Sequence, residues 1–109
     1  MKASITYSDF EKLELRIGTI LAAAAPDWSS KLLRFEVDFG DEGKRIIFSG
    51  IKAWYSPDEF VGKQFPFLIN LDPKKMGPEE SQGMMLMADG EDKPQLFSLP
   101  TVPAGTVIR

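Results

Sequence analysis

The sequence predicts a small all-β domain, and three observations lead to this prediction. Short segments in which apolar and polar residues alternate recur along the chain, and this period of two is that of a half-buried β-strand. Glycine, proline and other turn-forming residues separate these segments at short intervals. The 109 residues contain no long stretch of helical periodicity and no internal repeat. This length suits a single domain covering residues 1–109.

The alternation places five main strands along the chain. They are expected at residues 15–21, 33–39, 44–49, 65–70 and 83–88. The second is the clearest, because its four apolar residues alternate strictly with Arg34, Glu36 and Asp38. Residues 40–43 form a polar, glycine-rich turn, so the second and third strands are expected to pair as a hairpin. Gly18 inside the first strand predicts a bulge or a sharp bend.

Short helical turns are expected at two places that have the spacing of a capping box. One is Ser8 with Glu11, and the other is Ser56 with Glu59, where Pro57 occupies the favoured first helical position. A polar loop is expected at 71–82, and short closing strands at 96–99 and 106–108 form a C-terminal β extension. Five strands with a helical turn between the third and the fourth are the order of an OB-fold barrel. A small β-sandwich would give a similar pattern.

Composition excludes several classes of chemistry. The chain has no cysteine and no histidine, so it lacks thiol nucleophiles, thiolate metal ligands and the commonest general base. Its 16 acidic residues form no convergent motif, and Asp38, Asp41 and Glu42 lack the spacing of an EF-hand loop. We therefore expect no catalysis, no metal and no cofactor.

Charge and hydropathy bear on location and partners. The chain begins with polar residues, and its longest apolar run is far too short to span a membrane, so a cytoplasmic location without a membrane partner is expected. The net charge of −3 by itself argues against a nucleic-acid partner. A local basic patch can exist on an acidic body, however, so the distribution of charge matters more than its sum.

Six ordered segments resemble the tRNA-binding domain family. They are residues 9–18, 30–33, 45–51, 55–63, 70–76 and 81–84, within a match that extends from Ile5 to Arg109. This family includes the C-terminal domain of bacterial methionyl-tRNA synthetases, free-standing tRNA-binding proteins and the endothelial monocyte-activating polypeptide modules. One departure is Ser30, which stands where the family usually has an acidic residue before the lysine.

The resemblance implies an OB barrel with an RNA-binding groove on one face, and a homodimer in free-standing members. It also implies non-catalytic, structure-recognising tRNA binding, as an aid in trans to an aminoacyl-tRNA synthetase. The RNA-contacting positions of the family fall on Lys31, Arg45, Ser49, Asn70, Lys74, Lys75, Ser81 and Met84.

Several of these residues have a second interpretation. Lys74 and Lys75 contact phosphate or form an ordinary solvated pair, and Arg45 contacts RNA or pairs across strands with Glu36 or Asp38. Met84 belongs to the core or offers an adaptable apolar contact for a base. Trp28 stacks on an unpaired base or packs back over the barrel mouth.

Two other functions compete with tRNA binding. The same family contains CsaA-type secretion chaperones, which bind unfolded polypeptides. A module whose dimer face is its whole function is the third possibility. A homodimer is expected because the apolar C-terminal segment 96–108 predicts short strands whose open edges need a cover.

Overall fold

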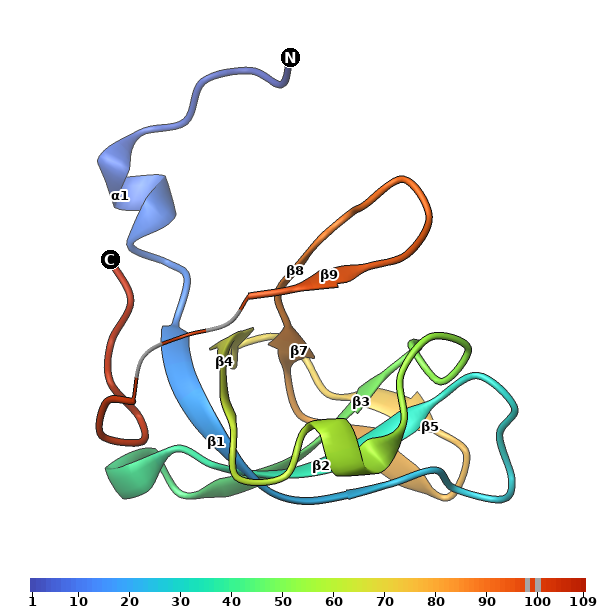
Figure 1. Ribbon diagram of the computed structural model, residues 1–109. Helices are drawn as coiled ribbons and strands as arrows, with labels where there is room; N and C mark the ends of the chain where they lie inside the picture. The colour runs from blue at the N-terminus through green and yellow to red at the C-terminus, as the bar shows by residue number, and fades with distance from the viewer. Residues whose placement is uncertain (98, 100) are drawn as a thin grey trace.

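The computed structural model describes residues 1–97, 99 and 101–109 and confirms a nearly all-β protein (Figure 1). Its helical turns are α1 (Tyr7–Phe10), η1 (Gly40–Glu42) and η2 (Pro57–Glu59). Its strands are β1 (Leu15–Ala24), β2 (Leu33–Asp38), β3 (Lys44–Ser49), β4 (Gln64–Leu68), β5 (Lys74–Met76), β6 (Glu79–Ser81), β7 (Met84–Met85), β8 (Met87–Ala88) and β9 (Gln95–Leu96).

Five antiparallel strands in the order β3-β2-β1-β4-β7 form a nearly closed barrel. The gap between the two outer strands is bridged just before β7, where the backbone N–H of Gln82 donates to the carbonyl of Ile46 at 2.8 Å. The side-chain oxygen of Gln82 accepts from the N–H of Ile46 at 3.0 Å. The predicted OB-type barrel is therefore confirmed, including η2 between the third and fourth strands.

The barrel encloses one hydrophobic core. The alternation of β2 is confirmed, because Leu33, Phe35 and Val37 are fully buried while the residues between them are only half-buried. Strand β4 is buried at nearly every position, since both of its neighbours and the barrel interior cover it. The core cluster consists of Ile20, Leu33, Phe35, Val37, Phe39, Ile47, Ile51, Phe60, Phe65, Phe67, Ile69 and Met85.

Strand β1 changes register between Ile20 and Ala22, which lets its first half pair with β4 and its second half with β2. The irregularity that was expected at Gly18 thus lies near Leu21. Glycine is needed at position 18 for a different physical reason. A methyl group there would touch Val37 and come within 2.7 Å of the Phe39 ring. Only glycine lets the backbone approach these core side chains so closely.

The first helical turn begins earlier than expected. Thr6, and not Ser8, is the N-cap of α1, and its hydroxyl accepts from the N–H of Asp9 at 3.0 Å. The Asp9 carboxylate accepts from the N–H of Thr6 in return. The predicted capping box between Ser56 and Glu59 is confirmed in η2.

Two expectations for the second half of the chain were wrong. The predicted polar loop at 71–82 contains the β5–β6 hairpin, whose three cross-strand pairs form a sheet of their own. The predicted strand at 83–88 is divided at Leu86, whose N–H donates to the carbonyl of Pro66 at 2.9 Å. This division ends β7 and sends β8 outwards to pair with β9.

The C-terminal segment covers part of the edge of β1. The N–H of Ile17 donates to Thr106, the N–H of Ile108 donates to Leu15, and Arg16 bridges to Val107. This contact confirms that residues 106–108 close the barrel, although as a bridge and not as a full strand. The other closing strand, expected at 96–99, is short: β9 ends at Leu96, and Ser98 lies outside the described residues.

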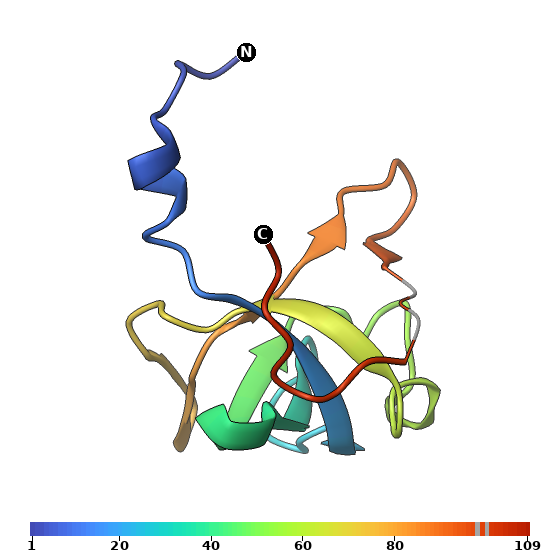
Figure 2. The same ribbon diagram turned by 90° about the vertical axis from the view of Figure 1, so that its left-hand side faces the viewer.

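Residues 1–14, the N-terminal arm, extend away from the barrel and carry α1 at some distance from it (Figures 1 and 2). The β8–β9 hairpin projects from the same end of the barrel (Figure 1). Across the described part of the chain, no helix has the length and apolarity needed to cross a bilayer.

We predict that Gly18→Ala lowers the free energy of unfolding by about 1–3 kcal/mol, the usual cost of overpacking a core. The added methyl group must displace Val37 and Phe39. Urea titration followed by circular dichroism measures the change. Gly50→Ala is the matched control, because a methyl group at Gly50 meets nothing within 4 Å. Equal stability of the two variants would contradict the packing explanation.

Candidate functional site

A groove of about 560 Å³ lies where the end of β3 meets the segments that follow β4. Its lining consists of Phe48, Ser49, Gly50, Leu71, Asp72, Lys74, Met76, Ser81, Gly83, Met84, Met85 and Met87. Six of the lining side chains are apolar, and two charged side chains of opposite sign, Lys74 and Asp72, stand among them. A site of this composition can hold a flat or extended apolar group while it offers a positive charge beside it.

Four of the five methionines of the chain line this groove. Met85 is 2% exposed and belongs to the core, whereas Met84 is 45% exposed and stands open to solvent. Met76 and Met87 are half-buried. Of the two interpretations of Met84, the structure therefore favours the exposed, adaptable contact. Met85 is core, and Met87 packs against the core.

Lys74 and Lys75 lie on β5, and the β5–β6 hairpin is held by contacts outside its own sheet. The guanidinium of Arg34 on β2 forms a bidentate pair with Glu79 on β6, with Nε and Nη2 donating at 2.8 and 2.9 Å. Such a planar fork fixes orientation as well as distance. Successive side chains of a strand point to opposite faces, so Lys74 lines the groove and Lys75 does not.

Trp28 supports the other end of this hairpin. Its ring packs against Phe48 with centroids 5.6 Å apart. It also lies so close to Gly77 that a methyl group there would meet the indole at 2.6 Å. Gly77 has a φ of +55°, which suits the tight turn between the strands. Trp28 therefore packs back onto the barrel, although 40% of its surface stays exposed.

Ser49 and Ser81 also line the groove, but the hydroxyl of Ser81 is used internally. It accepts from the N–H of Phe48 at 3.0 Å and donates to the carbonyl of Gly83 at 3.2 Å. Ser81 is 4% exposed. An unpaired N–H at Phe48 would be costly, so this hydroxyl replaces the strand partner that the edge of β3 lacks.

Arg45 makes neither of the ion pairs considered from the sequence. Its Nη1 donates to the carbonyl of Ile69 at 2.6 Å and more weakly to that of Gln82 at 3.4 Å. These two carbonyls stand at the two ends of the segment that carries the hairpin and part of the groove. Arg45 thus holds both ends of this segment against β3.

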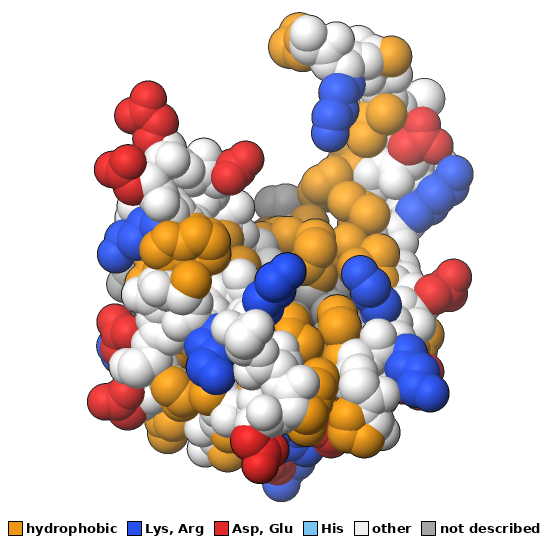
Figure 3. Space-filling view, turned by 90° about the vertical axis from the view of Figure 1, so that its right-hand side faces the viewer, with side chains coloured by type: hydrophobic (Ala, Val, Ile, Leu, Met, Phe, Trp, Pro, Cys, Tyr) orange, Lys and Arg blue, Asp and Glu red, His pale blue; other side chains and the backbone are white. Residues whose placement is uncertain are grey.

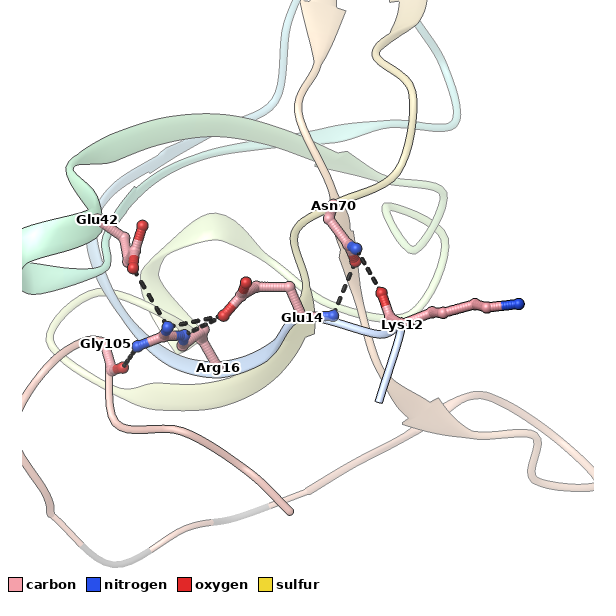
Figure 4. Close-up of polar contacts among 6 residues, drawn as sticks. All are labelled: Lys12, Glu14, Arg16, Glu42, Asn70 and Gly105. Carbon is pink, nitrogen blue, oxygen red and sulfur yellow. Dashed lines mark hydrogen bonds and ion pairs between the residues drawn. The ribbon is translucent and has the colours of Figure 1, made fainter. Parts of the chain in front are cut away.

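Asn70 uses both atoms of its side-chain amide on the backbone of the N-terminal arm (Figure 4). Its oxygen accepts from the N–H of Glu14 at 2.8 Å, and its nitrogen donates to the carbonyl of Lys12 at 2.6 Å. Figure 4 also shows Arg16 fixed by Glu14, Glu42 and the carbonyl of Gly105. Asn70 therefore links the groove segment to the place where the arm joins β1.

The predicted site residues divide into two groups. Ser49, Lys74, Ser81 and Met84 come together in the groove. The other four, Lys31, Arg45, Asn70 and Lys75, lie outside its lining. Lys31 is exposed in the loop between Trp28 and β2, where its carbonyl accepts from the N–H of Lys52 at 3.2 Å.

Sequence reasoning missed three residues that build the site: Arg34, Glu79 and Gln82. Arg34 was recognised only as a polar residue of the second strand, and Glu79 only as an acidic loop residue. Their pairing spans 45 positions, so no local pattern could have connected them. The charged residues inside the predicted 71–82 loop were the available signal that this segment had structure.

Charge is unevenly distributed on the surface. Figure 3 shows one face on which Lys and Arg side chains gather around exposed hydrophobic ones, while Asp and Glu lie mainly towards the rim. The acidic composition of the whole chain is therefore compatible with a face that attracts anions.

A small five-stranded barrel with a mainly apolar groove, which carries Lys74 beside Asp72, defines a ligand-binding module of the OB class. The sequence model of the family described as putative tRNA binding domain matches residues 15–107. The match covers most of the chain, so the chain belongs to this family.

Individual relatives agree with this assignment. The methionine–tRNA ligase of Methanoregula boonei is 47% identical over 105 residues, which cover 96% of this chain and 16% of that protein. Among solved structures, the MetRS-related protein of Pyrococcus horikoshii superposes with a TM-score of 0.87 at 33% identity, covering 99% of this chain and 100% of that one. The chaperone CsaA of Bacillus anthracis superposes with a TM-score of 0.86 at 28% identity, covering 98% and 100%.

The two kinds of relative differ in length. The chain spans between 12% and 16% of the methionine–tRNA ligases that it matches. It spans the full length of the two solved proteins. The methionine–tRNA ligases thus share with this chain a segment of about its length.

The Arg34–Glu79 pair predicts that the hairpin detaches in acid. The hydrogen bond from Arg34 holds the pKa of the Glu79 carboxyl below its ordinary value. A lowered pKa in the folded state stabilises the docked hairpin fully above the ordinary glutamate pKa, about 4.3. The contribution is lost as the pH falls through the lowered value. Trp28 fluorescence, measured in a Trp54→Phe background, should therefore stay constant down to about pH 4.3 and change below it.

Two matched variants test the assignment. Glu79→Gln should loosen the hairpin already at neutral pH and abolish the acid step. Glu80→Gln removes the same charge one residue further on, where the described residues show no ion pair, and should keep the step. An identical acid step in both variants would refute the role of Glu79.

Proposed function

We propose that this protein binds tRNA without catalysing a reaction on it. The observation that carries the proposal is the groove, which places an apolar, methionine-rich lining beside Lys74 at the base of a hairpin that carries a second lysine, Lys75. Membership of the tRNA-binding domain family and the similarity to methionine–tRNA ligases support the same ligand.

The two parts of the groove suit the two parts of a nucleotide. Protein recognition of RNA depends largely on shape, on phosphate contacts and on unpaired bases splayed out of the helix. The exposed side chain of Met84 offers an apolar surface for one such base, and the largely buried Phe48 belongs to the lining behind it. Lys74 and Lys75 would bind phosphates on either side of β5. Lys31 would bind a phosphate further along the RNA chain.

The remaining predicted contacts have a supporting role in this proposal. Ser81 and Asn70 satisfy their side-chain hydrogen bonds on the backbone, and Arg45 donates to two carbonyls. We propose that these three residues hold the groove segment in place and that Ser49 is the polar group left for the ligand. Substitution of Ser81, Asn70 or Arg45 would then weaken RNA binding by displacing the hairpin.

The proposal extends to the biological setting. The similar proteins reported above are named a methionine–tRNA ligase, a MetRS-related protein and a chaperone. We propose that the barrel raises the affinity of an aminoacyl-tRNA synthetase for tRNA, in trans where it is a separate chain. The cytoplasm, where tRNA is aminoacylated, is the proposed place of action.

The double variant Lys74→Ala/Lys75→Ala tests the ligand. Each lysine that contacts a phosphate displaces counterions, so the slope of log affinity against log salt should shrink by about 0.7–0.9 per lysine removed. Affinity for different tRNAs should fall about equally, because phosphate contacts position a ligand without reading its sequence. Filter binding of purified tRNA at several salt concentrations measures both quantities.

Lys44→Ala/Lys63→Ala is the matched control, since it removes two lysines that lie neither in the groove lining nor on the β5–β6 hairpin. The slope of log affinity against log salt should stay close to that of the wild type, because only the long-range attraction between protein and RNA changes. A hairpin variant that retains wild-type affinity and slope would show that the assigned groove is wrong.

A second candidate function is binding of unfolded polypeptide. Two observations favour it: the methionine lining of the groove, which can adapt to many apolar side chains, and the similarity to the chaperone CsaA. The same variants separate the two functions. Peptide binding should be insensitive to loss of Lys74 and Lys75 and should depend on Met84, whereas tRNA binding requires the lysines.

We also propose that the protein is a homodimer, for a reason that differs from the one drawn from the sequence. The C-terminal segment covers the edge of β1 itself, so it leaves little open edge there. The N-terminal arm instead exposes Ile5, Tyr7 and Leu13, next to exposed Val107. A second copy related by a two-fold axis would bury these apolar side chains against their own counterparts.

Light scattering at micromolar concentration should therefore give the mass of two chains. Ile5→Asp/Leu13→Asp should give a folded monomer, because a buried unpaired carboxylate is strongly unfavourable in an interface. Leu21→Asp is the control, since Leu21 is exposed to a similar extent but lies far along β1 from the arm. A wild-type monomer, or a dimer that survives the double substitution, would contradict the proposed interface.

A further inference from the structure

The thioethers of the groove are an unusual concentration of one oxidisable group. The chain has five methionines and no cysteine, and four of the methionines line the same groove. A sulfoxide is the one readily reversible oxidation product available to such a chain, because thiol chemistry is absent. The place where this chemistry can occur is also the place where the ligand is proposed to bind.

The four sulfur-bearing side chains differ in exposure. Met84 is 45% exposed, Met76 and Met87 are half-buried, and Met85 is 2% exposed. An oxidant in solution reaches the first before the others, and it reaches Met85 only if the barrel opens. Met1, at the far end of the N-terminal arm, is fully exposed and lies outside the groove. Met84 is thus the groove methionine most open to oxidation. Met1 and Met85 serve as internal references for an exposed and a buried methionine.

We propose that Met84, followed by Met76, is a reversible oxidation site through which peroxide switches off binding in the groove. The inference rests on the proposed function, because the groove must bind RNA for the modification to control it. It adds a regulatory modification to that function and does not depend on which tRNA is bound.

The chemical step needs a peroxide and no protein base. A lone pair of the Met84 sulfur attacks one oxygen of hydrogen peroxide, the O–O bond breaks and an S–O bond forms. The departing hydroxide takes up the proton of the oxygen now bound to sulfur, so the products are the sulfoxide and water. Sulfur loses two electrons, and the two peroxide oxygens gain one each. Methionine sulfoxide reductases reverse the reaction.

The consequence follows from the polarity of the lining. Oxidation turns a flexible apolar side chain into a polar one. A sulfoxide oxygen needs water or a donor, and a base placed over Met84 would remove the water without supplying a donor. Binding of that base should then weaken by about tenfold, the size expected for burial of one poorly paired polar group. The charge of the hairpin lysines does not change, so the salt slope should be unaffected.

The experiment compares the untreated and the peroxide-treated 109-residue chain. Mass spectrometry of peptides locates the sulfoxides, and filter binding measures affinity for tRNA. We expect sulfoxide at Met1 and Met84 first, then at Met76, with Met85 unmodified. Affinity should fall about tenfold with an unchanged salt slope. Treatment with methionine sulfoxide reductases should restore it.

Variants assign the effect to the groove. In Met76→Leu/Met84→Leu, peroxide should no longer lower the affinity relative to the untreated sample of the same variant. In a chain that lacks Met1 it should lower the affinity as in the wild type. Comparison with its own untreated sample removes any effect of leucine itself.

Four outcomes would overturn the inference. They are unchanged affinity despite sulfoxide at Met84 and Met76, an undiminished loss in the double leucine variant, a loss that reductases do not reverse, and a loss accompanied by unfolding in circular dichroism. Failure of the proposed function looks different, because the untreated protein would then not bind tRNA. That result would remove both proposals, and the defect would precede any oxidation.

Discussion

The exposed edge of β3 is the constraint on which the rest of the site depends. The N–H groups of Ile46 and Phe48 have no neighbouring strand to receive them, and a buried unpaired N–H costs far more than a hydrogen bond gains. Gln82 and Ser81 satisfy them with side-chain oxygens. This solution fixes residues 81–82 against the barrel, and Arg45 adds the carbonyls at both ends of the segment. The position of the hairpin and its lysines relative to the barrel is thereby fixed.

Two further contacts convert this attachment into a rigid groove. The Arg34–Glu79 pair fixes the direction of the hairpin, and Trp28 fills the space beneath its turn at Gly77. Both contacts come from the segment around β2, far away in sequence. A hairpin with only three cross-strand pairs would not be stable by itself in water. The barrel therefore supplies the stability, and the hairpin positions Lys74 and Lys75.

The sequence predicted the barrel well because the barrel depends on local signals. Strict alternation marked β2, and the Ser56–Glu59 capping box marked η2. The site was less predictable, because its parts are joined by contacts that no local pattern records. Arg34 and Glu79 are 45 residues apart, and the 71–82 segment has the polarity of a loop, although it forms a hairpin. Gly18 shows the same limit: a glycine in a strand indicates a special position, but only the packing of Val37 and Phe39 shows why.

The family motif combines two kinds of residue that the structure separates. The side chains of Lys74 and Met84 face the groove. Those of Ser81, Asn70 and Arg45 form hydrogen bonds with the backbone. A pattern of residue types cannot distinguish them, since residues of both kinds stand in or beside the same groove. The separation also explains why methionine suits the lining. A rigid frame can hold a soft surface, and the polarizable thioether that lets this surface adapt to a ligand is the same group that an oxidant attacks. Adaptability and sensitivity to oxidation are thus two consequences of one chemical choice.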